Sequence, residues 1–174
     1  MKIIEILKKL IELYKQLLAK KKEELKDFEA FALAVRNRES SNNYQAVNSL
    51  GYLGAYQFGL ARLCDLGYTK RKPNTTGYGH ENFEWVNPYT QEMFLTDNEL
   101  QDKIFKEHVD NLKSRLLKLY KDKLDYKITI SGLVMGAHLG GIGSVKKFFD
   151  NEDVSDAYGT SVGEYIRQFS GYNI

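Results

Sequence analysis

Glu39 is the acidic residue whose setting best suits acid/base chemistry. It follows an apolar, helix-like segment in which Phe31 and Val35 share one face, and it precedes the polar run at 40–43. We expect a carboxyl at that junction to lie half in a core and half in a cleft. Burial disfavours its charged form, so it could hold a proton and donate it to the leaving oxygen of a glycoside. The alternative is a solvated helix-end Glu paired with a neighbouring Arg.

Other polar residues could contact Glu39 or a sugar bound beside it: Ser40, Tyr56, Gln57, His138 and Tyr165. Each also has an ordinary structural interpretation. Ser40 suits a turn, and the glycines around 51–59 suit a loop that carries Tyr56 and Gln57. His138 suits a buried helix position bonded to the backbone, and Tyr165 suits an amphipathic helix.

The order of these elements resembles that of lytic transglycosylases and goose-type lysozyme-like domains. Glu39-Ser40 resembles the family's opening Glu-Ser, 54–57 its Gly-x-x-Gln element, 135–141 its Ala-Tyr-Asn-Ala-Gly element, and Tyr165 its late Tyr. The resemblance covers about residues 28–172. The chain departs from the pattern where His138 and Leu139 stand in place of the family's Tyr and Asn.

The resemblance implies a mainly α, lysozyme-like domain that cleaves peptidoglycan between N-acetylmuramic acid and N-acetylglucosamine, without a cofactor. Glu39 would be the catalytic acid, Ser40, Tyr56, Gln57 and His138 would contact the sugar, and Tyr165 would orient Glu39. In a transglycosylase the same carboxylate then accepts the proton of the muramoyl 6-hydroxyl, and a 1,6-anhydro end forms.

A hydrolytic lysozyme, or muramidase, is the alternative reaction, and it usually needs a second carboxylate. The candidates for that second acid are Glu81, Glu84 and Asp97. They lie in no recognisable motif, and solvated surface positions explain them better. The sequence therefore favours the transglycosylase.

Two other classes of function stay open. One is a glycan-binding module of the same fold without turnover, which a loss of activity on changing Glu39 would exclude. The other is an assembly protein that acts through residues 1–25. Truncation of that segment would abolish partner binding by an assembly protein, whereas an enzyme core would keep its activity.

The N-terminal segment predicts an amphipathic helix. Apolar residues recur at heptad-like spacing from Ile3 to Leu17, with Lys and Glu between them. Such a helix packs on its own domain by default, although it could also pair with a partner helix or lie on a membrane. The expected organisation is a helix at 1–26 followed by a catalytic domain at 27–174.

The domain is expected to be helical around a small irregular or β-hairpin region at 68–90. A second helical segment is expected at about 27–39 and a short one at 59–67, and Thr96 is expected to cap a helix that reaches about Tyr120. A buried helix at 129–139 should break at Gly140-Gly141. The last helix should begin near Thr160 or Ser161 and end by Gly171.

Composition and charge limit which partners and cofactors the chain is expected to bind. The chain has 25 basic and 23 acidic residues and a net charge of +2, which argues against nucleic acid. No stretch approaches the roughly 20 apolar residues of a membrane span, and charges interrupt the N-terminal apolar run, so no signal peptide is visible. Cys64 suits a core position, and the three His residues lack zinc spacing, so no metal is expected. The expected place of action is the cell wall, whether periplasmic, extracellular or reached by phage delivery.

Overall fold

The computed structural model describes residues 2–152 and 154–174 and confirms a mainly α fold with a small β-hairpin. The helices are α1 (Lys2–Ser40), α2 (Leu60–Asp65), α3 (Gln91–Thr96), α4 (Asn98–Tyr120), α5 (Ile130–Phe149) and α6 (Val162–Phe169). Strands β1 (Thr69–Arg71) and β2 (Phe83–Trp85) pair antiparallel, and 3-10 turns lie at His80–Asn82 and Lys121–Lys123. Among the described helices, none is long and apolar enough to cross a membrane.

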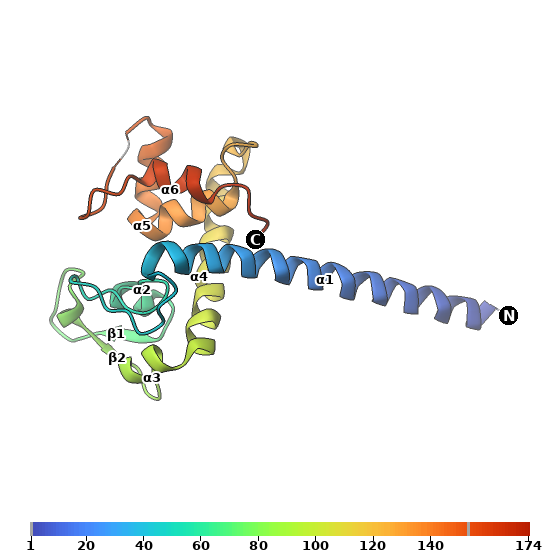
Figure 1. The fold of residues 1–174 in the computed structure, drawn as a ribbon, viewed down its shortest axis with the longest axis horizontal. Coiled ribbons are helices and arrows are strands. Elements are labelled where there is room, and N and C mark those ends of the chain that lie inside the picture. The colour runs from blue at the N-terminus through green and yellow to red at the C-terminus, as the bar shows by residue number, and fades with distance from the viewer. Residues whose placement is uncertain (1, 153) are drawn as a thin grey trace.

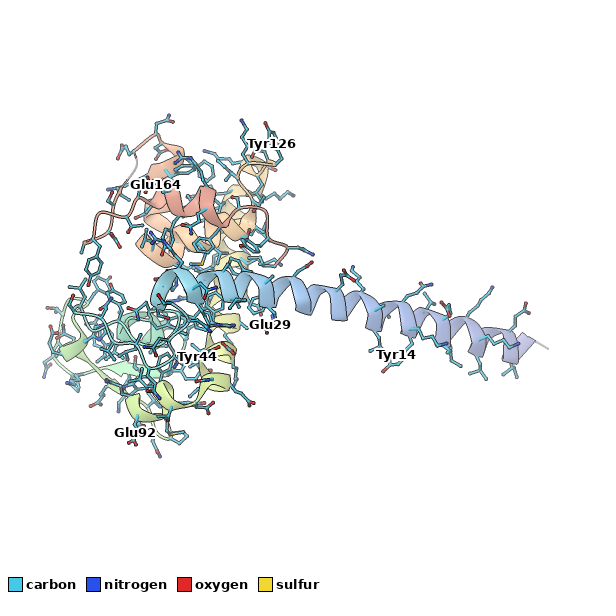
Figure 2. All side chains as sticks on the ribbon, in the orientation of Figure 1. Tyr14, Glu29, Tyr44, Glu92, Tyr126 and Glu164 are labelled. Carbon is cyan, nitrogen blue, oxygen red and sulfur yellow. The ribbon has the colours of Figure 1, made fainter. Side chains whose placement is uncertain are left out.

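α1 is one continuous helix that changes its surroundings along its length. Its N-terminal part projects away from the rest of the chain, and Tyr14, labelled in Figure 2, stands on this free part. Tyr14 is 63% exposed and Leu17 is 64% exposed, so the expectation that this stripe packs on its own domain is wrong. From Phe31 onward the same helix enters the core, because Phe31 and Val35 are fully buried. The segments expected at 1–25 and 27–39 are therefore one helix.

The buried end of α1 lies between two groups of elements (Figure 1). One group holds α2, α3 and the hairpin, the other holds α5 and α6, and α4 runs past both. Aromatic rings fill the junction: Tyr56 stacks on Phe105 at 4.0 Å between ring centroids, and Phe105 stacks on Phe31 at 5.9 Å. These contacts join the end of α1 to α4 and to the loop before α2, and Phe31 also contacts Phe169 of α6 at 6.3 Å between ring centroids.

The hairpin and the start of α4 follow simple local rules. Thr69 pairs with Trp85, and its buried hydroxyl donates to the carbonyl of Leu60 at 2.7 Å, which fixes the hairpin to α2. The expected cap at Thr96 is wrong by one residue. Asp97 is the N-cap of α4, and its carboxylate accepts from the Leu100 amide at 2.9 Å, whereas Thr96 is the last residue of α3.

Glycines let α5 and α6 approach closely. A Cβ on Gly132 would lie 2.3 Å from the carbonyl oxygen of Ile166, so only glycine fits there. The expected break is confirmed at Gly141, where φ is 78° and ψ is 169° inside α5. The turn before this break sets His138 and Leu139 at the end of the buried, straight part of the helix.

Candidate active site

Glu39 is the next-to-last residue of α1, and its side chain is 12% exposed. The Tyr165 hydroxyl of α6 donates to its Oε1 at 2.8 Å. The Nε2 of His138, from α5, lies 3.8 Å from the same oxygen, beyond hydrogen-bond distance. One carboxylate oxygen therefore faces groups from two other helices.

The end of α1 is fixed by backbone and side-chain bonds that hold Glu39 in place. Ser41 and Asn42 adopt positive φ, 55° and 62°, and the Asn42 amide bonds back to the carbonyl of Arg36 at 2.9 Å. The Ser40 hydroxyl donates to the carbonyl of Ala55 at 3.0 Å. This bond joins the helix end to the loop that carries Gln57.

That loop is built around a close backbone approach. A Cβ on Gly54 would lie 2.2 Å from Oε1 of Gln101, a fully buried side chain that also accepts from the Ala55 amide at 2.8 Å. The following turn holds Gln57 at φ 50°. A non-glycine residue in this region costs free energy, and such residues gather where structure serves function. Here the turn brings Gln57 to the cavity walls.

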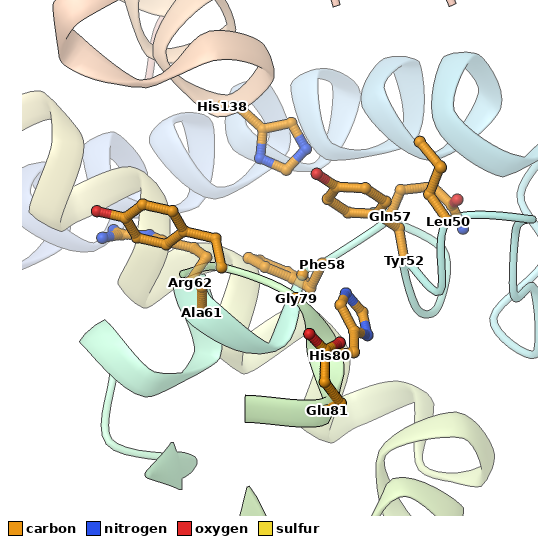
Figure 3. A pocket seen from close by; sticks show the side chains of 12 residues that line it. Leu50, Tyr52, Gln57, Phe58, Ala61, Arg62, Gly79, His80, Glu81 and His138 are labelled. Atoms are coloured by element: carbon orange, nitrogen blue, oxygen red, sulfur yellow. The ribbon is translucent and has the colours of Figure 1, made fainter. Parts of the chain in front are cut away.

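Two cavities, of about 330 and 520 Å³, meet at shared walls and form one groove. Leu50, Tyr52, Gln57 and His138 line both of them. The smaller holds Glu39, and the larger extends past His80 and Glu81, as Figure 3 shows. An elongated ligand could lie along this groove with Glu39 beside one part of it.

The groove is bridged near Glu39. The hydroxyls of Ser49 and Tyr158 lie 2.7 Å apart, although the residues are 109 positions apart in sequence. Tyr158 also lines the smaller cavity. This contact joins the loop that carries Asn48 and Leu50 to the loop that carries Asp156, and these three residues also line the smaller cavity.

Four of the six expected site residues gather at the smaller cavity: Glu39, Gln57, His138 and Tyr165. The described residues that line the two cavities do not include Ser40 or Tyr56. Tyr56 is fully buried and stacks on Phe105, and its hydroxyl donates to Asp102 at 2.6 Å and accepts from Arg36 at 2.7 Å. Its place is in the core beneath the loop, because its ring and hydroxyl both have partners there.

The acidic residues suggested as a second carboxylate are separated. Glu84 lies on β2 and pairs with Lys70 at 3.1 Å, and Asp97 caps α4. Glu81 lines the larger cavity, not the one that holds Glu39. Asp156 lines the smaller cavity, where its Oδ1 accepts from the amides of Tyr158 and Thr160.

Tyr165 and Arg38 pack together beside Glu39. The Arg38 guanidinium carbon lies 5.4 Å from the centroid of the Tyr165 ring, which is a favourable cation–π distance. Burial, and then the Glu39 carboxyl, raise the pKa of the Tyr165 hydroxyl above its ordinary value. Tyr165 therefore remains a neutral donor toward Glu39 across the physiological range.

Two residues that sequence reasoning missed lie behind His138. Arg62 donates from Nε to Nδ1 of His108 at 2.8 Å, and Nε2 of His108 lies 3.0 Å from Nδ1 of His138. Burial lowers the pKa of both imidazoles, and lowers that of His108 well below its ordinary value, so both are neutral at pH 7. The available signal was a His at an apolar helical spacing, with Ile104 and Leu112 four residues to either side.

Residues 2–152 and 154–174 contain no group of three or more His, Cys, Asp or Glu side chains placed to hold a metal ion. No protein-family model, curated protein or solved structure matches the chain.

Proposed function

We propose that this chain cleaves the glycan strands of peptidoglycan between N-acetylmuramic acid and N-acetylglucosamine, with Glu39 as its acid. The observation that carries the proposal is the mostly buried Glu39 carboxyl in a groove wall, with the Tyr165 hydroxyl bonded to one of its oxygens. The sequence resemblance to lytic transglycosylases suggests the substrate, and it gives Tyr165 this same role.

The proposed reaction begins with Glu39 protonated. Its proton passes to the glycosidic oxygen as the bond from that oxygen to the muramoyl anomeric carbon breaks, and positive charge develops on the sugar ring. The muramoyl 6-hydroxyl then bonds to the anomeric carbon and returns its proton to Glu39. The products are a 1,6-anhydro end and a free 4-hydroxyl on the leaving sugar, so no water is consumed.

The groove suits a sugar polymer. Tyr52 lines both cavities and Tyr78 the larger one, and both side chains are exposed. A tyrosine ring packs against the apolar face of a sugar while its hydroxyl makes hydrogen bonds. Gln57 adds a side-chain amide to the wall beside Glu39.

The arrangement of acids supports transglycosylation over hydrolysis. Of the three suggested second acids, Glu84 and Asp97 already have partners, and Glu81 borders the other cavity. Asp156 shares the cavity with Glu39, but its Oδ1 accepts from two backbone amides. One carboxyl that gives and retakes the same proton needs none of them. A muramidase would need a second carboxylate to act as the nucleophile or to activate water.

The test is mass spectrometry of the soluble fragments released from purified peptidoglycan by the intact protein, by Glu39→Gln and by Glu84→Gln. Glutamine keeps an oxygen for the Tyr165 hydroxyl but cannot deliver an acid proton. We expect 1,6-anhydro muropeptides from the intact protein and from Glu84→Gln, and none from Glu39→Gln. Reducing ends would instead identify a muramidase. No fragments from the intact protein, on a substrate that a control lysozyme digests, would refute the proposal.

A further inference from the structure

We propose that Arg62 and His108 are positioning residues that lock His138 as a neutral imidazole with its proton on Nε2, facing Glu39. The structural part of this inference stands by itself. Its kinetic consequence rests on the proposed function.

The argument starts at Arg62, because a guanidinium can only donate hydrogen bonds. Its Nε donates to Nδ1 of His108 at 2.8 Å, so that nitrogen must carry a lone pair. Two further bonds hold the guanidinium in position, from NH1 to Asp65 and from NH2 to Asn111 at 2.9 Å. His108 is buried and neutral, and its one ring proton must therefore be on Nε2.

The proton on Nε2 of His108 then determines the tautomer of His138. Nε2 of His108 lies 3.0 Å from Nδ1 of His138, so the first donates and the second accepts. A neutral His138 must carry its proton on Nε2, the nitrogen that lies 3.8 Å from Glu39. The Tyr56 backbone also raises the pKa of His138, as a carbonyl near a ring N–H does.

The same chain opposes a charge on His138. If His138 were protonated, its Nδ1–H would face the Nε2–H of His108. His108 could accept a hydrogen bond from it only if its own proton moved to Nδ1, where that proton would face the Arg62 N–H. The groups that face His138 are Glu39 of α1, Arg62 of α2, His108 of α4 and Tyr165 of α6. The Tyr56 backbone also lies against the ring. Burial, the largest effect, and Arg62 disfavour a charged ring, whereas the Glu39 carboxylate and the Tyr56 backbone favour it.

The consequence for the proposed reaction is a division of roles. His138 cannot take a proton, because Nδ1 is occupied and Nε2 is already protonated. It presents an N–H beside the carboxylate that forms when Glu39 gives up its proton. At 3.8 Å this N–H makes no hydrogen bond to Glu39, but a dipole held near a developing charge stabilises that charge without reorganising during the reaction.

The decisive variants are at His108, because this side chain is fully buried and is not among the described residues lining the two cavities. His108→Gln keeps an amide N–H near the position of Nε2 and can still donate to His138. His108→Leu keeps the volume but removes the donor. Arg62→Met tests the same inference in another way, because it removes the donor that holds the proton of His108 on Nε2.

The primary measurement is long-range proton–nitrogen NMR of the labelled full chain from about pH 7 to about pH 5.5, a range that spans the ordinary histidine pKa. We expect His138 to show a protonated Nε2 and an unprotonated Nδ1 throughout in the intact protein and in His108→Gln. In His108→Leu and Arg62→Met we expect mixed tautomers and uptake of a proton at higher pH. A protonated Nδ1 on His138 in the intact protein, or identical His138 signals in all four proteins, would overturn the inference.

The kinetic arm uses the fragment assay. Loss of the partner of a metal-ligating His costs about 10- to 100-fold. On the lower end of that scale, His108→Leu should lower kcat about tenfold, with little change in KM and partial rescue in His108→Gln. Equal loss in both variants would contradict the positioning role. If the intact protein releases no fragments, the proposed function fails, but the NMR result still decides the tautomer.

Discussion

Replacing Tyr165 with Phe removes the hydroxyl that bonds to Glu39 and leaves the ring. The ring keeps its packing against Phe169, at 5.3 Å between centroids, and its position beside Arg38. The lost contact is the 2.8 Å bond to Oε1. The substitution therefore tests one hydrogen bond with little change to the core.

The size of the effect depends on how the bond changes during the reaction. A hydrogen bond to a neutral group contributes about 1 kcal/mol and one to a charged group about 1.5–3 kcal/mol. Glu39 starts protonated in the proposed reaction and becomes a carboxylate, so the bond strengthens by about 0.5–2 kcal/mol. Only this difference lowers the barrier. At 1.36 kcal/mol per factor of ten, we expect kcat to fall about tenfold, with KM almost unchanged.

The assay is the initial rate of muropeptide release as a function of peptidoglycan concentration. The matched control is Tyr126→Phe, because the Tyr126 side chain is 84% exposed and is not among the described residues that line the two cavities. A kcat for Tyr165→Phe equal to that of the control would refute the assigned role of this hydroxyl. A rise in KM alone would instead mean that Tyr165 binds the sugar.

Two further predictions concern stability. Burial lowers the pKa of His108 in the folded chain, so below about pH 6.5 the unfolded chain binds more protons and the free energy of unfolding falls as pH falls. Urea unfolding between about pH 6.5 and pH 5 should show this loss, and His108→Gln should reduce its slope by up to about 1.4 kcal/mol per pH unit; an unchanged slope would mean that His108 titrates normally. Tyr56→Phe leaves the mostly buried Arg36 and the partly exposed Asp102 without its hydroxyl, so it should lower the unfolding free energy by about 1–3 kcal/mol while KM stays the same. A large rise in KM without a loss of stability would instead mean that Tyr56 contacts the sugar.

The helices and the hairpin could be predicted because local patterns determine them. Period-3.6 apolar spacing marked α4 and the buried part of α1, and Gly140-Gly141 marked the break in α5. The predicted N-cap of α4 was one residue early because Thr and Asp both suit an N-cap. In the structure α3 extends through Thr96, so Asp97 is the N-cap. The sequence could not show where residues 3–18 lie, because an apolar stripe predicts a helix but does not indicate which surface, if any, that helix packs against.

The candidate site could be predicted only where residue type alone indicated chemistry. Glu39 and Tyr165 were expected to meet, and they lie 2.8 Å apart although 126 residues separate them. Tyr56 stood in the same short motif as Gln57, yet the turn sends them to opposite sides, one into the core and one to the groove. Arg62 and His108 carry no motif, because their role arises from contacts between α2, α4 and α5.

These contacts limit which group can act as the base in the proposed reaction. Tyr165 donates toward Glu39, and its raised pKa keeps its proton in place. In the inferred tautomer, His138 also presents a proton, and its other nitrogen is occupied by His108. The Glu39 carboxylate itself is then the acceptor for the 6-hydroxyl proton, because Asp156, the other carboxylate that lines this cavity, accepts two backbone amides through its Oδ1. Glu39 has just given up its proton, and the donors beside it stay in place. It is therefore suited to take the proton of the muramoyl 6-hydroxyl as that hydroxyl attacks the anomeric carbon of the same sugar. The two proposals are thus linked: an Nδ1–H tautomer at His138 would free Nε2 to act as a base, and activation of water would then compete with ring closure.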